Sequence, residues 1–155
     1  MKKVAHLWSI MFRNSIVDGE TNNLSLLNII EELRITTERV EMLAQKERKA
    51  IPIEFEVVTS WRKLLGREKS VSGKAKIELI DPLGKLLHEA FYEVLIKENI
   101  ERLRSRARYN GFLITVPGEY TFKILLQEEG QKDFSEVGRI QLNLKQAVEI
   151  SKKMK

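Results

Sequence analysis

The segment Gly111–Gln127 constrains the fold of this chain more than any other. It reads GFLITVPGEYTFKILLQ, with a Pro-Gly pair between two stretches rich in Thr, Ile and Phe. Such residues fit the pleated surface of a sheet, and a Pro-Gly pair favours a turn because Pro fixes φ while Gly admits positive φ. After the turn, large apolar residues occupy every second position, namely Tyr120, Phe122, Ile124 and Leu126. The segment therefore predicts a strand, a tight turn and a half-buried strand.

The same alternation recurs along the rest of the chain. Further strands are predicted at residues 4–12, 51–61, 74–80, 86–96 and 137–144, with turn signals such as Asp81-Pro82-Leu83-Gly84 between them. Residues 24–36 fit either a helical face or a strand, and we favour a strand that returns from the first one as a hairpin. The regular turn spacing predicts a mainly β fold, a single antiparallel β-sandwich of about eight strands, immunoglobulin-like or C2-like.

Two densely charged segments stand apart from this pattern. Residues 37–50 combine charged residues with good helix formers and predict a short helical or charged insertion. Residues 146–155 carry three of the lysines and predict a basic C-terminal tail or short helix. The predicted organisation is therefore one sandwich domain over residues 1–145, followed by the basic tail.

The turn chemistry carries a resemblance. KIELIDPLGKLLHEAFYEV followed by GFLITVPGEYTFKILL resembles the run in immunoglobulin-like and C2-like sandwiches in which one strand ends in Asp-Pro-x-Gly and a Pro-Gly-x-Tyr corner leads into the next-to-last strand. With the opening strand and the Ile-Pro-Ile strand, the whole order is similar to a family of uncharacterised prokaryotic β-sandwich proteins with no assigned activity. This resemblance implies a fold and no particular chemistry.

Composition excludes several classes of function. The chain has no cysteine, so disulfides, thiolate catalysis and cysteine-based zinc sites are excluded. The start, MKKVAHLWSIMFR, carries His6 and Ser9 in its apolar run and lacks a small-residue cleavage site, so a first strand is a better interpretation than a signal peptide. Since no uncharged stretch reaches the roughly 18 residues of a membrane helix, we expect a soluble, cytoplasmic protein with no membrane contact.

The residues that usually carry catalysis or bind metals are isolated here. His6 and His88 have no ligand-spaced partner, and His6 is expected to share a strand face with Val4 and Trp8. Asp81 is explained by its turn, because a calcium site would need several clustered carboxylates. The serines form no nucleophile elbow, and the glycines form no phosphate loop. We therefore expect no catalytic, cofactor-binding or metal-binding residues and no enzymatic activity.

The sharpest feature is an arginine at every second position, namely Arg102, Arg104, Arg106 and Arg108. On a strand this spacing places all four side chains on one face as a cationic row roughly 20 Å long, which would bind anions in a salt-dependent way. A structural role is also available, because charged residues protect edge strands from aggregation. In that case Glu54, Glu56, Glu89 or Glu93 on neighbouring strands would pair with the arginines.

Two functions follow as expectations. The first is a non-catalytic protein-binding or assembly module that acts on a protein partner or by self-association, an inference that rests on analogy between folds. The alternative is an anion or nucleic-acid binder that uses the arginine row. Nucleic acid is thus an open partner but not the favoured one, because no ladder of exposed aromatic residues, except Tyr109, accompanies the arginines.

Overall fold

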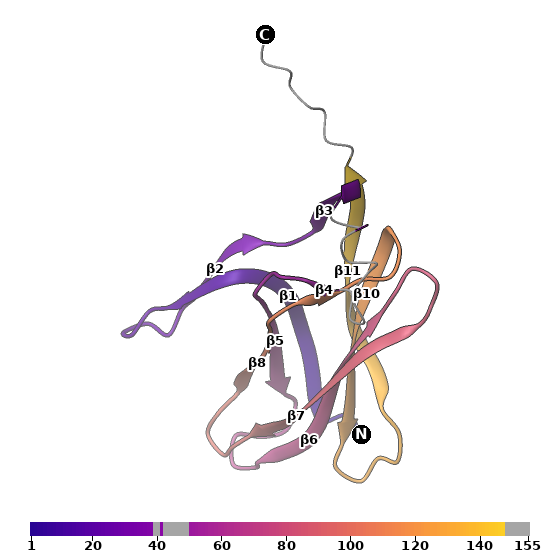
Figure 1. The fold of residues 1–155 in the computed structure, drawn as a ribbon. Coiled ribbons are helices and arrows are strands. Elements are labelled where there is room, and N and C mark those ends of the chain that lie inside the picture. Colours follow the sequence, from indigo (N-terminus) through magenta and orange to yellow (C-terminus); the bar gives the residue numbers. More distant parts are fainter. Residues whose placement is uncertain (39–40, 42–49, 148–155) are drawn as a thin grey trace.

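Two β-sheets pack face to face in the computed structural model, which describes residues 1–38, 41 and 50–147 (Figure 1). A four-stranded sheet has the order β2 (Leu24–Ile29), β1 (Val4–Val17), β5 (Phe55–Lys63), β8 (Arg102–Tyr109). A five-stranded sheet has the order β3 (Glu32–Thr36), β11 (Ser135–Ala147), β10 (Gly118–Glu128), β6 (Val71–Ile80), β7 (Leu86–Ile96). A short ribbon pairs β4 (Ala50–Ile51) with β9 (Phe112–Leu113). The predicted β-sandwich is therefore confirmed.

The core lies between the sheets and follows the predicted alternation. On β10, Tyr120, Phe122 and Ile124 are fully buried. The ring of Phe122 lies 6.0 Å from that of Phe55 and 5.9 Å from that of Tyr109, both on the four-stranded sheet. These edge-to-face contacts join the two layers, and aromatic pairs of this geometry contribute more than their buried area alone.

The Pro117-Gly118 turn differs from its prediction. β9 pairs with β4 rather than with β10, so the turn carries the chain into the five-stranded sheet instead of closing a hairpin. The Tyr120 hydroxyl fixes this corner, because it accepts from the amides of Thr115 (2.8 Å) and Val116 (3.2 Å) and donates to the Val116 carbonyl (2.6 Å). These bonds form a tyrosine corner, a feature of immunoglobulin-fold sandwiches.

Residues 24–36 form two strands in different sheets. β2 pairs antiparallel with β1 in the four-stranded sheet, whereas β3 pairs with β11 in the five-stranded sheet. The preference for strand over helix was correct. The β3–β11 pair is parallel, however, so the sandwich is not wholly antiparallel. Most of the predicted insertion at 37–50 and of the basic tail at 146–155 lies outside the described residues.

A β-bulge in β1 overturns the predicted faces of the first strand. Pairing with β5 shifts between His6 and Trp8, so His6 lies opposite Trp61, while Trp8 lies opposite Ser60. His6 therefore points between the sheets, where its Nε2 lies 2.8 Å from the Ser9 hydroxyl and its ring meets Trp61 edge-on. Burial, and to a lesser extent the charge of Lys2, lower the pKa of His6. Trp8 is left on the outer face of the sheet.

Asp81 cross-links two turns at one end of the sandwich. Its Oδ1 accepts from the amides of Leu83 and Lys85, and its Oδ2 accepts from the Thr115 hydroxyl at 2.6 Å. The Thr115 hydrogen bond is the largest cause of the lowered pKa of Asp81, followed among the lowering effects by the two amides. The carboxylate thus has its acceptors occupied by the chain itself, in agreement with the turn role expected from the sequence.

We expect Asp81→Asn to reduce the pH dependence of stability in acid. Because the pKa of Asp81 is lower in the folded chain than in the unfolded one, its contribution is fully present above about pH 4 and is lost as the pH falls through the folded pKa. Urea unfolding from pH 6 to pH 2 measures this, and the difference in unfolding free energy between parent and variant should shrink toward the acid end. A difference that stays constant with pH would contradict this role.

Two buried charged groups hold the opposite end of the sandwich. The Lys63 ammonium donates to the carbonyls of Lys69 (2.7 Å), Lys97 (3.1 Å) and Arg67 (3.3 Å). The Glu128 carboxylate accepts from the amides of Lys3 and Val4 through one oxygen, at 2.9 and 2.7 Å. Each of these two buried charges is therefore compensated by hydrogen bonds to several backbone groups. Among the described residues, no helix is long and apolar enough to cross a membrane.

Candidate anion-binding groove

β8 is an edge strand of the four-stranded sheet, and among the described strands its ladder partner is β5 alone. Its inward residues lie opposite core residues of β5, as in Tyr109 opposite Phe55 and Leu103 opposite Trp61. The four arginines occupy the intervening positions and point to the outer face. The predicted strand, its single arginine face and its edge position are therefore all present.

The four arginines differ in their surroundings. Arg108 pairs with Glu56 at 2.7 Å between Nε and Oε1. Arg104 donates from Nη2 to the carbonyl and to the side-chain oxygen of Asn22, at 2.9 and 3.0 Å. Arg102 and Arg106 have no hydrogen-bond or ion-pair partner among the described residues. Two guanidinium groups of the row, those of Arg104 and Arg108, thus bind other residues of the chain, and those of Arg102 and Arg106 are available to bind a ligand.

The predicted acidic partners are mostly elsewhere. Of the four glutamates expected beside the row, only Glu56 pairs with one of its arginines in the described part of the chain. Glu89 and Glu93 lie on β7, which belongs to the other sheet, and Glu89 approaches Lys76 instead. At one end of the row, Arg102 lies directly opposite Arg62 of β5. Like charges directly opposite one another on adjacent strands are destabilising, and a bound anion would relieve them.

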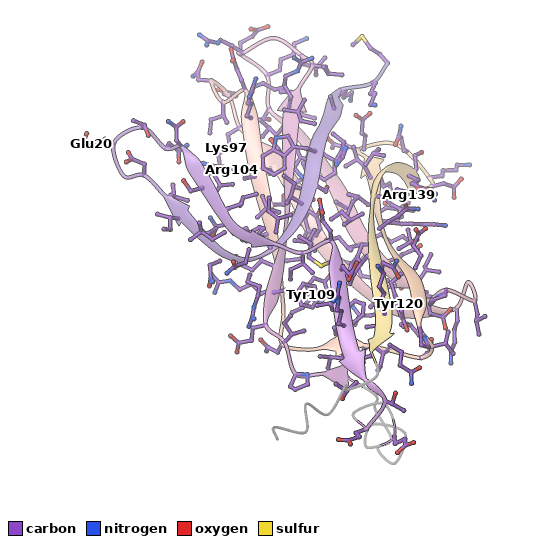
Figure 2. All side chains as sticks on the ribbon, turned by 90° about the horizontal axis from the view of Figure 1, so that it is seen from above. Glu20, Lys97, Arg104, Tyr109, Tyr120 and Arg139 are labelled. Carbon is purple, nitrogen blue, oxygen red and sulfur yellow. The ribbon has the colours of Figure 1, made fainter. Side chains whose placement is uncertain are left out.

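The tip of the β1–β2 hairpin forms one wall of a groove beside this row. Asp18 closes the tip by accepting from the amides of Glu20 and Thr21, and Asn22 adopts a left-handed φ of 58°. Asparagine tolerates this conformation better than most residues. In Figure 2 the hairpin that carries Glu20 extends on the side of the molecule where Arg104 lies. The Arg104–Asn22 hydrogen bonds tie this tip to β8.

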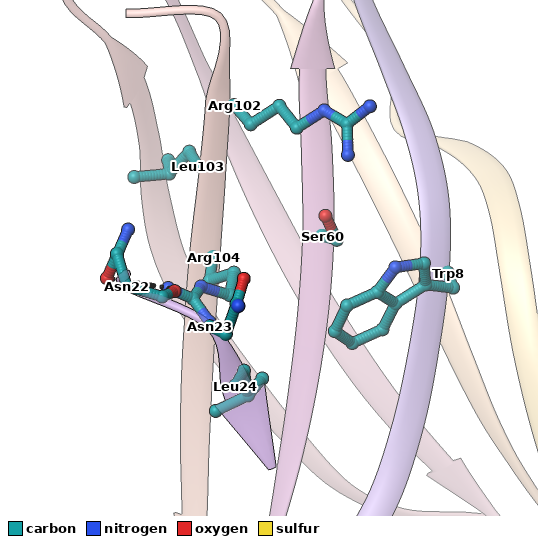
Figure 3. Close-up of a pocket in the computed structure, with 8 residues that line it drawn as sticks. All are labelled: Trp8, Asn22, Asn23, Leu24, Ser60, Arg102, Leu103 and Arg104. Carbon is teal, nitrogen blue, oxygen red and sulfur yellow. Dashed lines mark hydrogen bonds between the residues drawn. The ribbon is translucent and has the colours of Figure 1, made fainter. Parts of the chain in front are cut away.

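The groove between the hairpin tip and the sheet encloses about 380 Å³, within the usual range of ligand sites. Figure 3 shows the indole of Trp8 reaching from β1 toward Ser60, with the guanidinium of Arg102 extended over the same strand. The full lining comprises Trp8, Asn22, Asn23, Leu24, Ser60, Arg102, Leu103 and Arg104. None of these described lining residues is acidic, so two guanidinium groups set the charge of the groove. We call this site the arginine groove.

Sequence reasoning identified only part of this site. Arg102 and Arg104 enter the groove, whereas Arg106 and Arg108 continue along β8 outside it. Tyr109, the one aromatic residue expected near the row, instead stacks on Phe55 at 4.7 Å, and burial raises its pKa. The aromatic residue beside the arginines is instead Trp8. The sequence did not predict this, because nothing in the residue pattern indicates the bulge that turns Trp8 outward. Asn22 and Asn23 belong to the polar stretch before β2, and asparagine at such positions is typical of a turn rather than of a ligand site.

The other candidates for chemistry remain apart from this groove. His88 is exposed on β7, with its ring 5.8 Å from that of Tyr109, and His6 lies between the sheets. Within the described residues, no three His, Asp or Glu side chains are grouped so that they could hold a metal ion. The arginine groove is therefore the place where cationic, aromatic and amide groups converge.

Comparison with known proteins gives little. No protein-family model matches the chain, and no curated protein matches it. Among solved structures, it is similar to a β-glucosidase from Listeria innocua, with a TM-score of 0.42 and 11% identity over 77% of this chain and 15% of that one. A β-glucosidase from Erythrobacter marinus gives a TM-score of 0.36 and 19% identity over 57% of this chain and 13% of that one. Likeness at this level carries no argument about function.

Proposed function

We propose that this protein is a non-catalytic binding module whose ligand is anionic and binds in the arginine groove. The observation that carries the proposal is Arg102, whose guanidinium has no hydrogen-bond acceptor among the described residues and lies in a groove whose described lining contains no acidic residue. Guanidinium groups bind carboxylates and phosphates through paired N–H donors. The opposed Arg62 and Arg102 add a local excess of positive charge that an anion would offset.

The chemistry of the lining favours binding over catalysis. It supplies guanidinium, amide, indole and hydroxyl groups. Guanidinium groups stay protonated, and amide and indole groups do not ionise near neutral pH, so these groups orient a ligand rather than act as general acids or bases. A cytoplasmic location, expected from the sequence, remains part of this proposal. So does the resemblance to uncharacterised prokaryotic β-sandwich proteins.

We expect the double variant Arg102→Gln/Arg106→Gln to lose most of its salt-sensitive retention on heparin, a sulfated polyanion used here as the probe. These two arginines have no hydrogen-bond or ion-pair partner among the described residues, and Arg102 faces the like charge of Arg62, so their loss should not lower stability. Each ionic contact to a polyanion contributes roughly 0.7 to 0.9 to the slope of log affinity against log salt, so the slope should fall by about 1.5.

The matched control is Lys74→Gln/Lys132→Gln, which removes the same charge from exposed positions on the five-stranded sheet side. Retention that falls equally in both variants would mean that heparin responds to net charge and would sink the proposal. If the parent protein is not retained on heparin at all, the proposal is likewise wrong.

A protein partner is the second candidate, favoured by an exposed aromatic residue on the edge strand β7. Phe91 is 62% exposed, and its ring lies 6.3 Å from that of Phe134 on the outer face of the five-stranded sheet. Large apolar residues that gather on a surface mark contact sites more often than scattered ones do. Two results together would favour this candidate over the first. The protein would not be retained on heparin, and light-scattering chromatography would show a stable dimer that becomes a monomer after Phe91→Ser.

A further inference from the structure

We infer that the ligand of the arginine groove is a nucleotide unit, with its base stacked on Trp8 and its phosphate bound by Arg102. The inference rests on the proposed anion-binding function and narrows it from any anion to one chemical class. The groove brings together a flat aromatic side chain, Trp8, and the guanidinium of Arg102, which has no partner in the part of the chain that the structure describes (Figure 3). A nucleotide unit carries the complementary pair, a planar ring and a phosphate.

The first step concerns the aromatic surface. Trp8 is half-buried on the outer face of the four-stranded sheet, because the bulge after His6 reverses the side to which it points. Trp61, the other tryptophan of the chain, is fully buried in the core. Trp8 is thus the tryptophan that can present its ring to a ligand. Stacking of a base on such a ring tolerates any sequence, since every base has a π-face.

The second step concerns the phosphate. Arg102 and Arg62 face each other across β8 and β5, and both side chains are exposed. Arg104 donates two hydrogen bonds to Asn22. Because a guanidinium has five N–H donors, Arg104 retains further donors for a ligand. A phosphate in the groove would therefore meet guanidinium donors from β8 while Arg62 adds charge beside it. A carboxylate would satisfy the arginines equally well but would leave the Trp8 face without a partner.

The third step concerns the source of the nucleotide unit. A free nucleotide and a single strand present the same chemistry to Trp8 and Arg102. Arg106 extends the row beyond the groove, two residues from Arg104, and this spacing corresponds to roughly 6.7 Å along a strand. Proteins that bind single-stranded nucleic acid combine a positively charged groove with aromatic side chains on which bases stack. Here Trp8 supplies one stacking surface, and Arg102, Arg104 and Arg106 supply the charges along the strand.

The test uses the parent chain and Trp8→Leu, which keeps an apolar side chain but removes the stacking ring. The probes are a single-stranded oligonucleotide of about ten nucleotides, an abasic strand of the same length, a mononucleotide and inorganic phosphate. Tryptophan fluorescence reports stacking directly, because Trp61 is shielded in the core. Anisotropy of a labelled strand gives the affinity, and thermal unfolding checks that the variant is folded.

We expect the oligonucleotide to quench the fluorescence of the parent and to bind more tightly than the abasic strand. Trp8→Leu should bind the oligonucleotide roughly 5- to 150-fold more weakly, while its affinity for the abasic strand stays unchanged. Arg106→Gln should lower the salt slope for the oligonucleotide by about 0.7, with no effect on the mononucleotide. A mononucleotide that quenches as strongly and binds as tightly as the strand would support the same site chemistry with a free nucleotide as its source.

Two results would overturn the inference while leaving the proposed function in place. One is arginine-dependent heparin retention without quenching by any nucleotide probe. The other is equal affinity of parent and Trp8→Leu for the oligonucleotide, with the variant folded. Loss of arginine-dependent retention on heparin together with the absence of nucleotide binding would remove both proposals.

Discussion

Replacing Lys63 by methionine should lower the unfolding free energy by about 3 kcal/mol, because the buried ammonium makes three hydrogen bonds to backbone carbonyls, and all three would be lost. Methionine keeps most of the apolar stem, so the loss reports on the ammonium rather than on packing. In a domain of this size that loss corresponds to a melting temperature roughly 6–12 °C lower. Urea unfolding followed by the fluorescence of the tryptophans would measure it.

The matched control for this variant is Lys69→Met. Lys69 lies in the segment that follows β5, its side chain is exposed, and its carbonyl accepts from the Lys63 ammonium. Its replacement should change stability by less than about 0.5 kcal/mol. Equal effects of the two variants would show that Lys63 acts through general charge and not through its three carbonyl contacts.

The position of Lys63 connects this stability to the binding site. Its amide donates to the Glu101 carbonyl, immediately before β8, and its ammonium holds the Lys97 carbonyl in the preceding turn. Arg102 is the next residue after Glu101 and lines the arginine groove. Lys63→Met should therefore loosen the start of β8 as well as the domain, and ligand affinity should fall in the variant even well below its melting temperature.

Replacing Phe122 by alanine should lower the unfolding free energy by about 3–5 kcal/mol, the range found when large aromatic side chains are removed from a packed core. Phe122 is fully buried, and its ring lies about 6 Å from those of Phe55, Tyr109 and Phe112. The cavity would open between the two sheets, where the rigid β-ladders on either side limit collapse. Chemical unfolding would measure the loss.

Phe91→Ala makes the same chemical change on the surface. Phe91 is 62% exposed, so we expect a change of less than about 0.5 kcal/mol. A small effect at Phe122, comparable to that at Phe91, would mean that the two sheets are not joined through this aromatic cluster. The pair of variants thus separates burial from residue type.

The layers and most strands could be predicted because their information is local. Period-two alternation on β10 and β6, and the Asp-Pro-Leu-Gly turn at Asp81, depend on neighbouring residues alone. The arginine face of β8 followed from the same rule. Such features need no knowledge of which strands pair.

The groove could not be predicted because it depends on pairing and on irregularity. Trp8 points outward only because the β1 ladder slips by one residue after His6. Asn22 reaches Arg104 only because the hairpin tip approaches a strand that lies far along the chain. In the same way, a Pro-Gly pair between two strands is typical of a hairpin, whereas residues 117–118 form a corner that the hydrogen bonds of the Tyr120 hydroxyl stabilise. Tertiary contacts decided each of these points.

The parallel pairing of β3 with β11 also sets an order of events during synthesis. β1, β2 and β5 emerge early and can pair with one another, but β3 has no strand to join until β11, near the other end of the chain, has been made. Contacts between such distant segments form slowly, because a long loop must close before they are gained. β3 must therefore remain unpaired in the nascent chain until β11 has been made, and the pairing of β11 with β10 and β3 then completes the five-stranded sheet (Figure 1).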